Sequence, residues 1–217
     1  PTEQIIKAPL YRLLHEMSEG VKMTVSNRAL MALYFTQVAL HLLLAPHRDL
    51  LAGFAEEVFA RGVDGLSILS GASGIGAIFG GVAMSMRGKM SGLITILNLS
   101  ILLALAVIFI FATSGSFWIA VGCMFFVGAA FVINGTCMQT LLLNTTNRSN
   151  RGRVMALSLM VPLGFPALGA LVLGLLSNIY GLKIPLAGAS VLGLVLWVIA
   201  MRHVKRHAET LETPVVS

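Results

Sequence analysis

Six long apolar stretches constrain the fold of this 217-residue chain more than any other feature of its sequence. A helix needs about 20 consecutive, mostly apolar residues to cross the hydrocarbon core of a bilayer. The stretches that meet this requirement are approximately 28–45 (or, with an extension, 28–54), 63–86, 91–112, 117–143, 153–178 and 182–201. They are too long for transmembrane strands and lack the alternation of a β-barrel. The sequence therefore predicts an all-α transmembrane fold, a bundle of six helices.

Composition excludes several other classes of protein. Hydrophobic residues make up 57% of the chain and charged residues 11%, against about 25% charged residues in soluble domains. Two cysteines exclude a disulfide framework, and five scattered histidines lack the paired spacing of a metal site, so we expect no cofactor. Neither GxSxG with a histidine nor HExxH occurs, which argues against an intramembrane enzyme.

The basic residues indicate which ends of the helices lie on the cytoplasmic side of the membrane. A net charge of +6 would suggest nucleic acid as partner of a soluble protein, but here membrane topology explains the charges better. Twelve of the fifteen Lys and Arg residues fall on one side: Lys7, Arg12, Lys22, Arg28, Arg87, Lys89, Arg148, Arg151, Arg153, Arg202, Lys205 and Arg206. The other side has Arg48, Arg61 and Lys183. Because basic residues accumulate in cytoplasmic segments, both termini are predicted to be cytoplasmic.

The two terminal segments are expected to lie outside the bilayer. Residues 1–27 read as a cytoplasmic segment in which 9–17 form an amphipathic interfacial helix, the alternative being a solvated turn. Residues 203–217 read as a cytoplasmic tail. The chain begins with Pro1 and a polar segment, so we expect it to be a fragment.

Two junctions between the apolar stretches resemble known loop motifs. Residues 81–89, GVAMSMRGK, resemble the G-x-x-x-D-R-x-G-R/K signature of the major facilitator superfamily, with Ser85 and Met86 in place of its acid and first base. Residues 151–155, RGRVM, resemble the core of a motif in the exporter branch related to the enterobactin exporter, as do residues 54–69 and 164–169. The motif residues are Gly81, Arg87, Gly88, Lys89, Arg151, Gly152 and Arg153.

This resemblance implies a fold, an activity and partners. The chain would be the C-terminal six-helix half of a twelve-helix secondary transporter in a bacterial inner membrane, joined by residues 1–27 to an N-terminal six-helix half. It would export small amphipathic compounds or siderophores by alternating access, driven by proton antiport. Its partners would be the lipid bilayer, the other half and a small-molecule substrate. The alternative is a self-contained six-helix protein that dimerises as a pore or scaffold.

The resemblance also implies where substrate would bind, because the first and fourth helices of this half commonly line the central cavity. The polar candidates there are Gln37, His41, Arg48, Asp49, Asn134 and Gln139. If the first helix ends near Ala45, residues 47–49 form an external loop; if it continues to Phe54, they lie inside the cavity. Asp49 could then take up a proton and Arg48 could contact an anion. Hydrogen bonding between helices is the alternative for His41, Asn134 and Gln139.

Glycine and proline mark the packing and bending of two other helices. Gly76 and Gly80 form a small-xxx-small pair that lets helix backbones approach closely, as do Ser70 and Gly74. In the fifth stretch, Pro162, Gly164 and Pro166 predict a helix that bends, because each proline removes a backbone donor.

Overall fold

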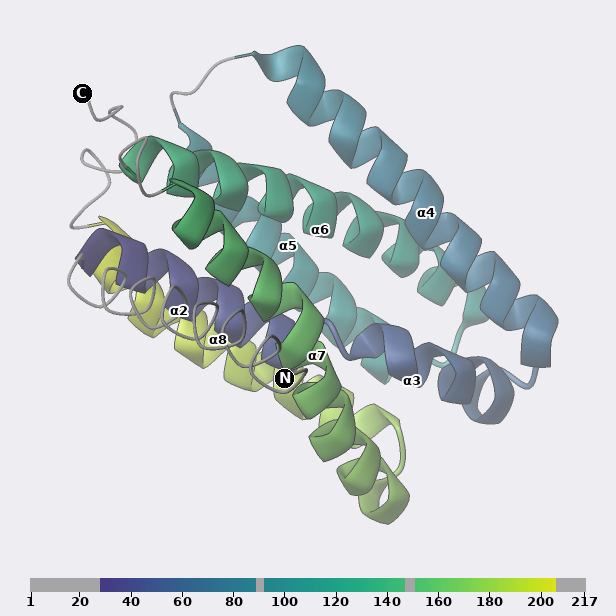
Figure 1. Cartoon of the computed structure of the whole chain (residues 1–217). Coiled ribbons are helices and arrows are strands. Elements are labelled where there is room, and N and C mark those ends of the chain that lie inside the picture. Colours follow the sequence, from purple (N-terminus) through teal and green to yellow (C-terminus); the bar gives the residue numbers. More distant parts are fainter. Residues whose placement is uncertain (1–27, 89–91, 147–150, 206–217) are drawn as a thin grey trace, which may run out of the picture.

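The computed structural model describes residues 28–88, 92–146 and 151–205 as an all-α bundle (Figure 1). Its helices are α2 (Arg28–Leu43), α3 (His47–Gly53), the π-helix η1 (Phe54–Val58), α4 (Gly62–Arg87), α5 (Leu93–Thr113), α6 (Phe117–Thr145), α7 (Arg151–Tyr180) and α8 (Lys183–Lys205). Within the described ranges, five helices, α4 to α8, are long and apolar enough to cross a membrane. The predicted all-α transmembrane fold is confirmed. The expected interfacial helix, Lys89 and most of the C-terminal tail lie outside the described residues.

The first apolar stretch differs from the unbroken helix expected over residues 28–54. It is divided into α2 and α3 by a turn at residues 44–46. Pro46 has no N–H, and the N–H of Ala45 donates instead to the Leu40 carbonyl at 3.3 Å. α2 therefore ends close to Ala45, but residues 47–49 begin a second helix, α3, and do not form a loop.

The helices pair in a pattern that relates the two halves of the chain. α4 packs most extensively against α6, and α2 packs in the corresponding way against α7. α5 contacts α6 and α8, while α8 contacts α2 and α5. Exchanging the first three long helices (α2, α4, α5) with the last three (α6, α7, α8) reproduces these main pairs. Such a pattern is typical of the inverted repeats from which transporter folds are built.

Glycine sets the close approach of α4 and α6. A Cβ built on Gly128 would lie 1.9 Å from the Ser73 carbonyl oxygen, and one on Gly76 would lie 1.8 Å from that of Phe125. Because no side chain fits there, the two backbones touch directly. The packing predicted for Gly76 is confirmed, whereas Gly74 is exposed with nothing within 4 Å of its Cβ position.

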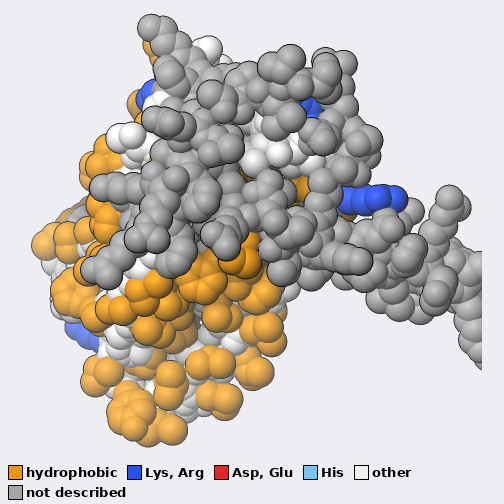
Figure 2. Space-filling view, turned by 90° about the vertical axis from the view of Figure 1, so that its left-hand side faces the viewer, with side chains coloured by type: hydrophobic (Ala, Val, Ile, Leu, Met, Phe, Trp, Pro, Cys, Tyr) orange, Lys and Arg blue, Asp and Glu red, His pale blue; other side chains and the backbone are white. Residues whose placement is uncertain are grey.

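The surface suits lipid. Large apolar side chains are exposed along α4 and α7, among them Ile78 at 66% and Leu163 at 80%. In the view of Figure 2, hydrophobic side chains form broad areas and only a few Lys and Arg side chains are visible. Exposure of such large apolar surfaces to water is unfavourable, so a bilayer or another protein must cover them.

Candidate functional site

Four side chains gather where the broken first span meets α6, and we call this cluster the break site: His41, His47, Arg48 and Phe131. The Phe131 ring lies 6.5 Å from the His41 ring and 5.4 Å from the His47 ring, between centroids. The Arg48 guanidinium carbon lies 5.5 Å from the Phe131 centroid. Arg48 is exposed and His47 is only 1% exposed, so the cluster presents a cation on an aromatic and imidazole wall.

A backbone carbonyl holds each histidine, within α2 for His41 and at the turn for His47. Nδ1 of His41 lies 2.9 Å from the Gln37 carbonyl oxygen, and Nδ1 of His47 lies 2.6 Å from that of Leu44. Because a carbonyl oxygen only accepts, each Nδ1 is the donor, which leaves Nε2 as an acceptor in the neutral ring. His47 also donates its backbone N–H to the Leu44 carbonyl at 3.1 Å, so one residue closes the turn twice.

Gln37 does not lie at the break site but joins α2 to α7. Its Nε2 donates to the Ser158 carbonyl at 3.2 Å, and the Ser158 hydroxyl lies 3.4 Å from its Oε1. In a regular helix that carbonyl would accept from residue 162, but Pro162 has no N–H. Gln37 therefore supplies the donor that the proline removes, and Tyr34 adds a second bond from α2 to the Val154 carbonyl.

A second proline on the other side of the same interface has a comparable effect. Pro46 leaves the Leu42 carbonyl without its helical donor, and a Cβ on Gly169 of α7 would lie 2.0 Å from that oxygen. Both α2 and α7 thus have a proline-weakened turn on their shared interface. Gly164 is exposed and has open space at its Cβ position. α7 continues as one helix through both Pro162 and Pro166.

The remaining candidates separate into buried and exposed groups. Asn134 lies one turn after Phe131 on α6 and is 3% exposed; its Nδ2 has no partner among the described residues. Gln139 and Asp49 are exposed. The structure therefore gathers His41 and Arg48 at the break site and places Asp49 next to it in sequence. Gln37 meets the site only through its carbonyl oxygen, which accepts from His41, while its side chain bonds α7.

The loop-motif residues lie in the last two turns of α4 and at the start of α7. Arg87 ends α4, and Gly88 caps it with a φ of +57°, which favours glycine. Gly81 lies near Val132 of α6. The exposed residues at the start of α7 are Arg151, Gly152 and Arg153.

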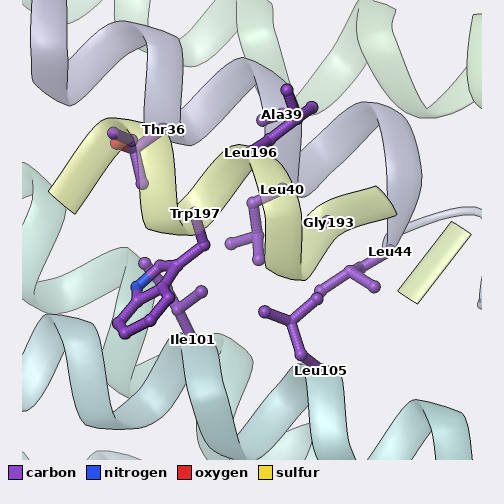
Figure 3. A pocket seen from close by; sticks show the side chains of 10 residues that line it. Thr36, Ala39, Leu40, Leu44, Ile101, Leu105, Gly193, Leu196 and Trp197 are labelled. Carbon is purple, nitrogen blue, oxygen red and sulfur yellow. The ribbon is translucent and has the colours of Figure 1, made fainter. Parts of the chain in front are cut away.

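Two other possible binding features are weaker. A pocket between α2, α5 and α8 is lined by side chains that include Leu40, Leu105 and Trp197 (Figure 3). Its volume is about 20 Å³, room for a single water and too little for a substrate. Among the residues that the structure describes, no group of His, Cys, Asp and Glu could hold a metal ion.

Sequence reasoning missed Phe131 and Ser158. An apolar ring and a serine within apolar helices carry no signal of their own, and both matter only through partners from α2. The break itself had a signal in Pro46, which lies inside an apolar stretch.

The comparisons with known proteins fit this architecture. The model of the transmembrane secretion effector family matches residues 3–214. Searches of curated proteins and of solved structures each found no match. The match covers nearly the whole chain, including every described helix. The chain therefore belongs to the transmembrane secretion effector family, a family of transporters of the major facilitator type.

Proposed function

We propose that this bundle is one half of a proton-driven exporter of small amphipathic compounds or siderophores. The observation that carries the proposal is the break site, where an exposed Arg48 lies over Phe131 beside a broken helix. In transporters built from inverted repeats, substrates bind at discontinuous helices near the middle of the membrane. The guanidinium would contact an anionic part of the substrate, and the ring would contact an apolar part.

Alternating access requires helices that bend, and the interface of α2 and α7 supports this. A proline weakens each helix there, and the Ser158 carbonyl depends on Gln37 for its donor. Because that side-chain bond is easier to break than a helical bond, the interface is a natural place for the two repeats to move against each other.

Proton coupling is assigned to Asp49. It is exposed one residue after Arg48, at the start of α3. An ionisable group within a membrane helix is costly and usually faces a water-filled pathway. The alternative is a coupling acid in the other half of the transporter.

The other half would be an N-terminal six-helix bundle of the same polypeptide. The exposed apolar faces of α4 and α7 support a protein partner as well as lipid. The distribution of basic residues supports cytoplasmic termini in a bacterial inner membrane. The reading frame upstream of Pro1 tests this: six further apolar spans are expected, and a start codon within a few residues of Pro1 would contradict it.

Export of two probes by intact cells tests the substrate site. The probes are 2,3-dihydroxybenzoylserine, an anionic catecholate, and the amphipathic cation ethidium. Arg48→Gln should slow catecholate export about tenfold to a hundredfold, because a hydrogen bond to a charged group contributes roughly 1.5–3 kcal/mol. Arg48→Lys should retain part of the rate, since it keeps the charge. Equal rates for wild type and Arg48→Gln at equal membrane abundance would remove Arg48 from the site.

The coupling assignment is tested by adding an uncoupler to the same assay. Export by the wild type and by Asp64→Asn, a control at the start of α4, should stop when the proton gradient collapses. Asp49→Asn should be inactive or insensitive to the gradient. If Asp49→Asn remains proton-driven, the coupling acid lies elsewhere.

A further inference from the structure

A second pocket lies at the end of the bundle that carries η1, and we call it the η1 pocket. It has a volume of about 500 Å³ and is open to the surface. Its walls are Glu57 and Val58 of η1 together with residues 180–184, which join α7 to α8. None of its lining residues belongs to the break site, so it is a separate feature of the molecule.

Local geometry builds this pocket from both repeats. Gly181 has a φ of +77° and donates its N–H to the Ser177 carbonyl at 2.9 Å, which turns the chain sharply after α7. The Leu182 side chain then packs on α3, with its Cδ1 3.0 Å from a Cβ position on Gly53. The α7–α8 turn is thereby held against η1, and the pocket lies between them.

The π-helix is the second unusual feature at this place. The Phe59 N–H donates to the Phe54 carbonyl at 3.0 Å, five residues back, which is the π-helical pattern. Short π-helical segments occur frequently at functional sites. Here η1 places Glu57 in the pocket wall, whereas the neighbouring Glu56 lies outside it, with Oε2 3.2 Å from a Cβ position on Gly62.

The pocket holds two opposite charges that do not neutralise each other. Glu57 and Lys183 both line it and both are exposed. Within the described ranges neither has an ion-pair partner. A carboxylate and an ammonium that share a pocket without bonding each other are suited to a ligand that itself carries both charges.

The side chains around the pocket are of the kinds that suit the level of lipid headgroups. Ile179 is 73% exposed and Ile184 is 63% exposed, on either side of the turn. Tyr180, which also lines the pocket, is 58% exposed. Large apolar side chains beside charged groups, with a tyrosine between them, are typical of the boundary between hydrocarbon and headgroups.

We propose that the η1 pocket binds the headgroup of a zwitterionic phospholipid with a primary ammonium group, such as phosphatidylethanolamine. Glu57 accepts hydrogen bonds from the ammonium and Lys183 donates to the phosphate. A quaternary ammonium has no N–H to donate, so phosphatidylcholine binds less well. The bound lipid contacts η1 from the first repeat and the α7–α8 turn from the second, and so stabilises their packing.

Native mass spectrometry of the delipidated, full-length transporter tests the proposal. The protein is titrated separately with phosphatidylethanolamine, phosphatidylcholine and phosphatidylglycerol of the same acyl chains. Phosphatidylethanolamine should bind about threefold to fivefold more tightly than phosphatidylcholine, as expected for an exposed charge pair. Glu57→Gln should abolish this preference without weakening phosphatidylglycerol, because the anionic lipid does not use the carboxylate. Lys183→Gln should weaken all three lipids, because each of them carries the phosphate.

Glu56→Gln is the matched control, because it removes the neighbouring carboxylate outside the pocket and should leave the preference unchanged. Glu57→Asp and Lys183→Arg keep the charges and should retain the preference in part, which separates charge from folding. Several results would overturn the proposal: no preference in the wild type, a preference that survives Glu57→Gln, or an equal effect of Glu56→Gln. Competition by equimolar soluble phosphoethanolamine would identify a soluble zwitterion instead and would overturn the lipid assignment.

Discussion

The bond between Gln37 and Ser158 leads to a quantitative prediction about how α2 holds a proline-containing helix. Gln37→Leu keeps the approximate volume of the side chain but removes the donor at 3.2 Å from the Ser158 carbonyl. Pro162 cannot replace that donor, so a buried acceptor is left unsatisfied, at a cost of roughly 1–3 kcal/mol. Hydrogen bonds between membrane helices average about 0.6 kcal/mol and reach about 1.7 kcal/mol. We therefore expect the free energy of unfolding to fall by about 1–2 kcal/mol.

The effect of Gln37→Leu should be much smaller when it is combined with Pro162→Ala. Pro162→Ala restores a backbone N–H four residues after Ser158, which can donate to the same carbonyl. In that background Gln37→Leu should cost no more than about 0.5 kcal/mol, because only the long 3.4 Å contact with the Ser158 hydroxyl is lost. The two substitutions should therefore be coupled by about 1 kcal/mol.

The assay is reversible unfolding in bicelles. Steric trapping measures the unfolding free energy of the wild type, both single mutants and the double mutant. Pro166→Ala is the control, since its restored N–H would serve the carbonyl of residue 162, which Gln37 does not contact. The cost of Gln37→Leu should be unchanged in the Pro166→Ala background. The reasoning is refuted if Gln37→Leu and Pro162→Ala are additive within about 0.5 kcal/mol, or if Pro166→Ala couples equally strongly.

Two further predictions concern α6. Gly128→Ala should lower the unfolding free energy by about 1–3 kcal/mol, because its Cβ would lie 1.9 Å from a backbone oxygen of α4. Gly122→Ala is the control: nothing lies within 4 Å of its Cβ position, so it should not destabilise the protein in the same unfolding assay. Asn134→Leu should leave the unfolding free energy unchanged or raise it, since the buried amide nitrogen has no partner among the described residues; a clear loss of stability would mean that the amide is satisfied.

The membrane fold was predictable from sequence because hydropathy is a local property. Each stretch of apolar residues has to form a helix in lipid, since no water is there to satisfy its backbone groups. The same reasoning predicted α4 to α8 to within a few residues. At the first stretch, hydropathy places the helix end near Ala45, close to the observed end of α2 at Leu43. It does not show that a second helix begins at His47 after the turn at residues 44–46, because hydropathy records how apolar a segment is and not whether its backbone donors are present.

The candidate site was predictable only in part. Arg48 and His41 could be named as polar residues in a cavity-lining helix, and they do meet at the break site. Their partner Phe131 could not be named, because an apolar ring in an apolar helix has no distinguishing signal. Gln37 had the same sequence signature as His41, yet it bonds α7.

The sequence by itself determined that this chain forms long apolar helices suited to a membrane, and where α4 to α8 begin and end to within a few residues. Only the tertiary structure decided which helices are neighbours, and hence that Gln37 meets Ser158, 121 residues away. The physical reason is that lipid tails are as apolar as leucine, so hydrophobicity does not select a partner helix. Close contact at Gly128 and Gly169 and the carbonyls exposed by Pro46 and Pro162 select it instead, and these act only once two helices lie side by side.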